Sequence, residues 1–227
     1  MKVSIHQPNF FPWLGFFNKV YKSNIFVFLI TSNRSKTDRY LSRCQINNNN
    51  KKYYLSIPIG TSQCPIKDIK LPNKKPNWRQ KFLNVISESY RKSPFFDQIY
   101  CDIEFLILSD FEFFYEYNMN ILNFYFSKFN IDTKIFIDSD LSDNFGKSNI
   151  RNINICKHLK SKTYISGIGA RSYNDENLYK SNSIDLVYQK YDFPEYKSLS
   201  SSFIAGLSII DTLFCCGYDK TEFLIKK

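Results

Sequence analysis

The chain has 227 residues, 43% of them hydrophobic, and a formal net charge of +10 at pH 7. This length and apolar content suffice for one sizeable core, so a single domain over residues 1–227 is expected. No charged N-terminal segment leads into an apolar one, and the most apolar stretch, residues 105–129, is broken by three acidic residues. We therefore expect a cytoplasmic protein without a secretion signal or a membrane span.

The six cysteines contain no C-x-x-C pair and there are only two histidines. We therefore expect reduced core thiols rather than a disulfide framework, and no metal site. The basic excess has two explanations: an anionic partner, such as nucleic acid or a phosphorylated small molecule, or codon bias in a chain rich in Asn, Lys, Ile, Phe and Tyr. The lysines stand in ones and twos, which favours codon bias.

The first thirty residues predict a parallel βαβ unit. Lys2–Ile5 has the pattern of a short strand that ends before Pro8. Pro12 suits a first helical turn, and the apolar stripe after it predicts a helix that ends at Asn24. The apolar run Ile25–Ile30 is typical of a strand buried on both faces, and two strands joined by a helix run parallel.

The rest of the chain predicts an alternation of strands and helices. Expected strands are Tyr40–Ile46, Tyr53–Ile59, Ile66–Leu71, Lys134–Ile137, Thr163–Ser166 and Ile184–Tyr188. Expected helices are Trp78–Tyr90, one or two over residues 95–129, one capped by Ser148 that ends at Leu159, and Ser202–Cys216, which stops at Gly217. This order predicts an α/β fold: a three-layer or Rossmann-like sheet, with a small antiparallel region and a helical segment around residues 78–130.

Four segments carry polar side chains that a purely structural sequence would not need. The first is His6 with Gln7, Asn9 and Trp13, between the first strand and the first helix. Open α/β sheets bind ligands at the carboxyl ends of their strands, and helix N-termini attract phosphates. His6 is expected to donate or accept a proton, and the other three to bind substrate. The alternative is a capping or core histidine.

The second segment is "RSKTDRYLSR", which follows the second buried strand. Arg43 projects from the next strand, and an arginine fork suits a phosphate or a carboxylate. For Arg34 and Arg39 a solvated basic loop is the favoured interpretation.

The third segment is "YISGIGARSY", in which a strand runs into two closely spaced glycines. Backbone N–H groups exposed there could bind an anion, with Ser166, Gly167, Arg171 and Tyr173 as the candidate binding residues. The alternative is a tight turn that needs the conformational freedom of glycine. No dinucleotide or P-loop motif is present.

The fourth segment is "LSIIDTLFCCG", where Ser208 and Asp211 stand three residues apart on an otherwise apolar helix. A carboxylate beside such a face is costly unless it has a partner. Asp211 could orient His6 or bind a substrate amine. Equally, it could form a buried salt bridge with Arg43 or Arg171.

Taken in order, these segments resemble the WbqC-like family across almost the entire chain. The resemblance is carried by "IHQPNFFPWLGFFNKV", Arg43, "LSIPI", Trp78 with Lys81, the run Tyr90–Phe96, "YISGIGARSY" and "LSIIDTLF-x-x-G". Members are encoded mainly among genes for O-antigen, the lipopolysaccharide side chain, and for other surface polysaccharides. The resemblance implies a cytosolic enzyme that acts on a nucleotide-linked amino sugar and forms an amide.

The chain also departs from that family. After the second strand, relatives resemble "L-D-D-V-Q", whereas this chain has Leu29, Ile30, Thr31, Ser32 and Asn33. Near the end, Ser198 stands where a Gln is expected and Cys215 where an Asn is expected. A different substrate or an inactive paralogue is therefore an open alternative.

The leading hypothesis is transfer of an acyl or aminoacyl group to the amine of a nucleotide-linked sugar. His6 would be the general base or the donor to the oxyanion, Arg43 and Arg171 would hold the phosphates, and Asp211 would orient His6 or the amine. The donor would be acyl-CoA, an aminoacyl-tRNA, or ATP plus an amino acid. The alternatives are a non-catalytic nucleotide-sugar-binding or scaffold protein and a tRNA-binding aminoacyl transferase. A homodimer is left open.

Overall fold

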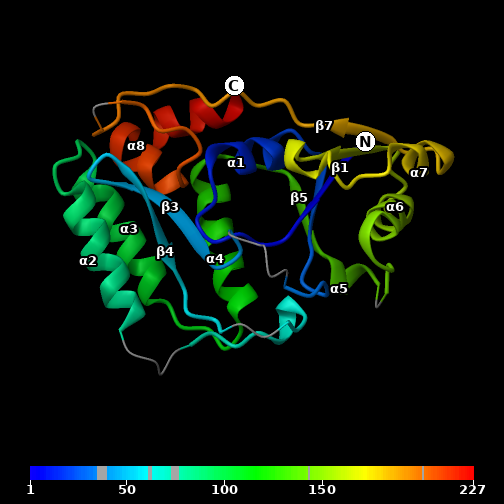
Figure 1. Ribbon diagram of the computed structural model, residues 1–227, viewed down its shortest axis with the longest axis horizontal. Coiled ribbons are helices and arrows are strands. Elements are labelled where there is room, and N and C mark those ends of the chain that lie inside the picture. The colour runs from blue at the N-terminus through cyan, green and yellow to red at the C-terminus, as the bar shows by residue number, and fades with distance from the viewer. Residues whose placement is uncertain (35–39, 61–62, 73–76, 143, 201) are drawn as a thin grey trace.

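The computed structural model describes residues 1–34, 40–60, 63–72, 77–142, 144–200 and 202–227. A five-stranded parallel sheet runs in the order β5-β2-β1-β6-β7 (Figure 1). Its strands are β1 (Lys2–His6), β2 (Ile25–Phe28), β5 (Lys134–Ile137), β6 (Thr163–Ser166) and β7 (Asp185–Tyr188). An antiparallel hairpin joins β3 (Arg43–Asn48) to β4 (Lys51–Ser56). The predicted α/β fold with a small antiparallel region is confirmed.

The order of the strands reverses beside β1. The chain first extends the sheet from β1 through β2 to β5, and then adds β6 and β7 on the other side of β1. Val3 is in register with Ile25 on one side and with Tyr164 on the other. The connections after β1 and β6 therefore leave in opposite directions, and in open parallel sheets ligands bind in the crevice at such a switch point.

Alternate residues of β2 bury into two different cores, which makes three layers. Phe26 and Phe28 join the core formed with α1 (Leu14–Tyr21) and α4 (Phe114–Lys128), where Phe28 stacks on Phe126. Ile25 and Val27 join the core formed with α6 (Ser148–His158) and α7 (Glu176–Ser181). A strand buried on both faces has no polar alternation, which explains the continuous apolar run in its sequence.

A second helical group lies beside the hairpin, at the left of Figure 1. It contains α2 (Trp78–Tyr90), α3 (Phe96–Leu108) and α8 (Ile209–Lys226), and the ring of Tyr90 stacks on Phe214 with centroids 4.5 Å apart. Most aromatic residues of segment 95–129 likewise belong to the core or pack against it, whereas Phe95 and Phe105 are exposed.

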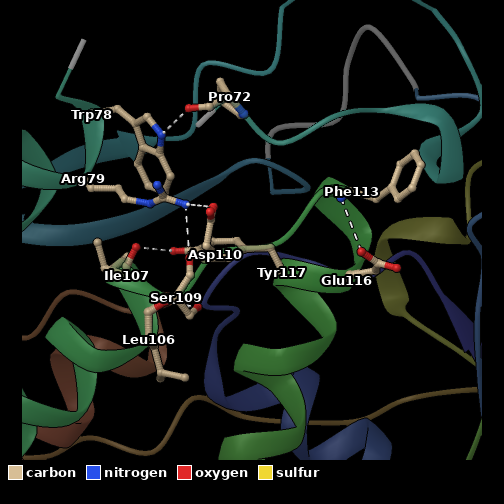
Figure 2. A network of polar contacts seen from close by, with 10 residues as sticks. All are labelled: Pro72, Trp78, Arg79, Leu106, Ile107, Ser109, Asp110, Phe113, Glu116 and Tyr117. Atoms are coloured by element: carbon tan, nitrogen blue, oxygen red, sulfur yellow. Dashed lines mark hydrogen bonds and ion pairs between the residues drawn. The ribbon is translucent and has the colours of Figure 1, made fainter. Parts of the chain in front are cut away.

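Polar contacts fix the start of α2 to the segment before it and to the turn between α3 and α4 (Figure 2). The Trp78 indole donates to the Pro72 carbonyl at 3.1 Å. The Arg79 guanidinium donates to the Ser109 carbonyl at 3.1 Å and pairs with Asp110 at 3.5 Å. Trp78, which the family resemblance singles out, therefore has a structural role at this junction.

Several predicted elements have different bounds or a different type: for example, the predicted strand Tyr53–Ile59 lies at Lys51–Ser56. Segment Ile66–Leu71 is not a strand: it contains a 3-10 helix (Ile66–Asp68) followed by a single bridge between Lys70 and Phe113. The first helix is confined to Leu14–Tyr21, and the predicted strand from Tyr40 begins only at Arg43. Ser148 is not a cap, because Lys147 holds that position without a side-chain hydrogen bond.

The predicted helix Ser202–Cys216 begins later and ends later. It starts at Ile209, after Gly206 with a φ of +77°, and Gly217 kinks it instead of ending it. Short elements that the pattern did not predict are α5 (Asp138–Leu141), α7 and a 3-10 turn over Ile168–Ala170. Each is under two turns long, too short for an apolar period to show.

All six cysteines are unpaired, but Cys101 is exposed, so not all of them are core thiols. Within the described part of the chain, no helix has the length and apolarity needed to cross a membrane.

Candidate functional site

A cleft opens at the switch point, where β1 and β6 end. It consists of two adjoining hollows of about 500 Å³ and about 370 Å³, here named the outer lobe and the inner lobe. Both are lined by Ile5, His6, Trp13, Tyr40, Tyr164, Ala170 and Tyr173. The outer lobe adds Gln7, Asn9, Leu29, Ser148, Asn149, Arg151, Asn152 and Asn174. The inner lobe adds Gly15, Lys19, Ser166, Gly167, Ile168, Gly169, Gln189, Tyr191 and Phe193.

His6 ends β1 and lies in the wall that the two lobes share. Its Nδ1 lies 2.9 Å from the Gln7 carbonyl oxygen, so Nδ1 carries the proton and donates it. Burial and the positive charge of Lys19 nearby disfavour the cation and outweigh the hydrogen bond to the Gln7 carbonyl, so the pKa of His6 falls to about 3. At neutral pH the imidazole is therefore uncharged, and its Nε2 is a hydrogen-bond acceptor, not a donor.

Two amides follow His6 in the outer lobe. Gln7 donates from Nε2 to the Ser32 hydroxyl at 3.1 Å. Asn9 is 2% exposed, and its Oδ1 has no hydrogen-bond partner among the described residues. A buried amide oxygen without a partner is costly, so Asn9 is suited to accept a hydrogen bond from a ligand.

Aromatic rings form the walls. The ring of Trp13 lies 5.0 Å from that of Tyr40, and the Trp13 backbone bridges to Ser208 at the start of α8. Tyr164 stacks on Tyr179 behind the cleft. Flat apolar surfaces of this kind suit a sugar or a nucleobase.

The loop after β6 forms the opposite side of the cleft. Ser166 is buried, and its hydroxyl accepts a hydrogen bond from Asn174 Nδ2 at 3.0 Å. A Cβ at Gly167 would meet nothing within 4 Å, so no close packing explains this glycine. Tyr173, which is 69% exposed, stands at the rim of both lobes.

The polar face of α6 was not predicted as part of the site. Arg151 lines the outer lobe, and its Nε donates to the Gly146 carbonyl at 2.8 Å. Asn152, one residue later, donates to the hydroxyls of Tyr164 and Tyr179. The signal in the sequence is "SNIRN", a mostly polar run at the start of a helix whose later apolar residues, Ile153, Ile155 and Cys156, are buried.

Lys19 is a further residue that the sequence analysis missed. It is only 4% exposed, lies on α1 with Nζ 5.6 Å from the centre of the Phe26 ring, and lines the inner lobe. Burial lowers the pKa of its amine to about 7. The available signal was a lysine within the apolar stripe Phe16–Val20.

Two of the predicted arginines lie outside the cleft. Arg43 is on β3 with its guanidinium over the Tyr54 ring. Arg171 is exposed and stands over the Tyr188 ring in a separate depression beside β7. Arg34 donates to the Gly60 carbonyl, and Arg39 lies outside the described residues.

The structure does not bring Ser208 and Asp211 to His6. Ser208 caps α8 and donates from Oγ to the Phe11 carbonyl at 2.6 Å. Asp211 is fully buried and accepts hydrogen bonds from Tyr90 at 2.8 Å and from Tyr196 at 2.6 Å. Burial raises the pKa of Asp211, against the opposing effect of these hydroxyls. Its partners are thus tyrosines, rather than the arginines of a salt bridge.

The segment after β2 accommodates its departure from the family pattern through Asp138. This buried carboxylate accepts hydrogen bonds from the backbone N–H of Ile30 at 2.8 Å and from the hydroxyl of Thr31. An acid at residue 31 would place a second carboxylate against Asp138, so the threonine is compatible with the acid that follows β5.

The lining of the cleft can bind anions better than metals. No Asp or Glu is among the described residues that line it, whereas Lys19 and Arg151 supply cations. Across the described chain, no cluster of three or more His, Cys, Asp or Glu side chains could hold a metal ion.

Comparison with known proteins agrees with the resemblance seen in the sequence. A family model described as "WbqC-like protein family" matches residues 7–223. "Uncharacterized protein Rv1507c" of Mycobacterium tuberculosis (strain ATCC 25618 / H37Rv) is 26% identical over 232 residues, which cover 98% of this chain and 97% of that protein. No solved structure matches. Because the family match spans nearly the whole chain, this protein belongs to the WbqC-like protein family.

Proposed function

We propose that this protein transfers an acyl or aminoacyl group to the amine of a nucleotide-linked amino sugar, during cytoplasmic assembly of a surface-glycan precursor. The observation that carries the proposal is the cleft at the sheet's switch point, with a neutral histidine in the wall between its two lobes. Such a cleft is the usual ligand site of an open parallel sheet. Membership of the WbqC-like family supports the same assignment.

The outer lobe is assigned to the nucleotide sugar. Arg151 and the neighbouring amides, Asn149, Asn152 and Asn174, provide donors for a diphosphate, and Trp13 with Tyr40 provides a flat wall. Arg43 and Arg171 do not line the cleft, so Arg151 takes the phosphate-binding role expected of them.

In the reaction, the sugar amine attacks the carbonyl carbon of an activated acyl donor. A C–N bond forms, the bond from the carbonyl carbon to the leaving group breaks, and the amine loses one proton. His6 Nε2, free of a proton, accepts a hydrogen bond from the amine, orients its lone pair and passes that proton on to the departing leaving group. The donor class is acyl-CoA, an aminoacyl-tRNA, or an amino acid activated by ATP.

The test is incubation of the purified protein with UDP- and TDP-linked amino sugars and each donor class, followed by mass spectrometry of the sugar. We expect a product whose added mass equals the acyl group. His6→Gln should lower turnover by about 100-fold or more. His158→Gln, which changes the exposed second histidine, should leave it unchanged. No product with any donor, or equal turnover by His6→Gln, would contradict the proposal.

A second candidate is a non-catalytic protein that binds a nucleotide sugar. The observation that favours it is the replacement of the family's acidic segment by Ile30 and Thr31, next to a cleft whose described lining has no carboxylate. Calorimetry separates the two candidates. Micromolar binding of a nucleotide sugar with no turnover under any donor would favour the binding protein.

A further inference from the structure

Lys19 is a buried amine for which the folded chain provides no anionic partner. None of the salt bridges between described residues includes it, and its Nζ makes no hydrogen bond with them. The amine lies instead over the face of the Phe26 ring. Lysines are almost never fully buried unless they are paired, and an unpaired buried ammonium group is costly.

The position of Lys19 explains how such a group could acquire a partner. It lines the inner lobe together with the loop after β6, where a Cβ added at Gly167 or Gly169 would meet no atom within 4 Å. A ligand can therefore approach that backbone closely. Lys19 is otherwise buried, with its amine over the ring of Phe26 on β2.

We infer that Lys19 binds an anionic oxygen of the ligand, a phosphate or a carboxylate, in the inner lobe of the cleft. The inference rests on the proposed function only in taking the cleft as the ligand site. A phosphate would come from the nucleotide sugar, and a carboxylate from the amino acid or acyl group. The other titratable side chains that line the lobe are His6 and four tyrosines, Tyr40, Tyr164, Tyr173 and Tyr191.

Those neighbours determine the expected pH behaviour. His6 is neutral above pH 5, and burial raises the pKa of Tyr164, Tyr173 and Tyr191. The amine of Lys19, with its pKa lowered to about 7, is mostly unprotonated at pH 8 in the empty cleft. A bound anion stabilises the ammonium form, so binding at pH 8 should take up a proton.

The experiment is calorimetry at pH 8 in two buffers of different ionisation enthalpy, with UDP-N-acetylglucosamine as the phosphate probe and glycine as the carboxylate probe. We expect wild type to bind one of them with uptake of close to one proton. Lys19→Met should weaken that binding by about 10-fold or more and abolish the uptake. The probe whose binding Lys19→Met weakens shows whether the anion is a phosphate or a carboxylate. The matched control is Lys22→Met, an exposed lysine at the end of the same helix.

The substitution Lys19→Met keeps the length of the side chain and removes a buried amine, so the variant should fold and have an equal or higher Tm. A loss of Tm with unchanged affinity for both probes would show a structural lysine and overturn the inference, as would failure of both probes to bind wild type. Binding that depends on Lys19, without turnover, would support the inference and contradict the proposed transferase. Turnover that survives in Lys19→Met would support the proposed transferase and contradict the inference about Lys19.

Discussion

His6 and Lys19 have lowered pKa values for the same reason. Lys19 is buried and His6 is partly buried, and no carboxylate compensates among the described residues of the cleft. Protonation of either residue also disfavours protonation of the other, since the charge of Lys19 is the second cause of the lowered pKa of His6. The empty cleft therefore disfavours positive charge, although both residues are basic in free solution.

Stability should depend on pH through His6. Its pKa is 6.5 in the unfolded chain and about 3 in the folded one, so between these values the unfolded chain binds more protons. Its contribution to stability is therefore present above pH 6.5 and is lost as the pH falls toward 3. Between pH 7 and pH 4.5, wild type should lose about 2 kcal/mol more of its free energy of unfolding than His6→Gln does, within the limit of ~1.4 kcal/mol per pH unit.

Urea unfolding at the two pH values measures this difference. His158→Gln is the control, because the second histidine is exposed on α6 and should leave the acid dependence as in wild type. Parallel losses in wild type and His6→Gln would show that His6 titrates normally in the folded chain.

At the scale of elements, the sequence predicts the helices and strands that depend on a local pattern. It fails where contacts with a distant segment determine the structure. The strands of the parallel sheet follow from apolar runs, and β5 and β6 have the predicted bounds. Segment Ile66–Leu71 has the composition of a strand, but its backbone bonds are split between Ile30, Ser32 and the turn before α4. Those partners are too distant in the sequence for a local pattern to reveal them.

The candidate site shows the same division. His6 is the last residue of β1, and the loop comes directly after β6. Both therefore lie in the cleft, and a local pattern in the sequence identifies the two strands. Arg43 lies elsewhere because β3 belongs to a separate hairpin rather than to the parallel sheet. Lys19 could not be found by residue type, since a lysine in a short helix is usually solvated and only the packing of α1 buries it.

The kink of α8 makes a prediction for Gly217. Its φ is +70° and its ψ is −176°, a region open almost only to glycine, and an added Cβ would lie 2.7 Å from the Phe95 ring. Gly217→Ala should therefore reduce the free energy of unfolding by about 2–4 kcal/mol, from backbone strain plus overpacking.

Gly206→Ala is the matched comparison. Gly206 also has a positive φ, +77°, but its nearest neighbour would be a Phe193 ring atom at 3.7 Å, so only backbone strain of about 1 kcal/mol is expected. Equal losses in the two variants, measured by urea unfolding, would mean that Phe95 moves aside and that the kink does not depend on close packing.

At the scale of the whole molecule, the C-terminal helix α8 is hydrogen-bonded to the first βαβ unit at both of its ends. The start of α8 is bound to the loop before α1, through Ile209 N–H to the Pro12 carbonyl at 2.8 Å and through Ser208. Its end is bound to α1 itself, through Asn18. The segments that form the cleft are thus joined across almost the full length of the chain, which agrees with a single family match over residues 7–223.

Asn18 is the residue through which this arrangement can be tested. Its Nδ2 donates to the Ile225 carbonyl at 2.7 Å, and its Oδ1 accepts from Gln189 Nε2 at 2.9 Å, all in a buried position. Asn18→Ala removes both hydrogen bonds from the buried core, so it should lower the free energy of unfolding by about 2–4 kcal/mol. Asn84→Ala, at an exposed site on α2, should change it by less than about 0.5 kcal/mol.

The same variant should also weaken ligand binding, because Gln189 lines the inner lobe and is held there by Asn18 and by the Gly15 carbonyl at 2.8 Å. Freed from Asn18, Gln189 retains one of its two contacts, and α1 loses its hydrogen bond to the end of α8. We expect the affinity for the probe bound by wild type to fall several-fold under conditions where Asn18→Ala is still folded. Unchanged affinity together with the loss of stability would show that α8 holds the molecule together without shaping the cleft.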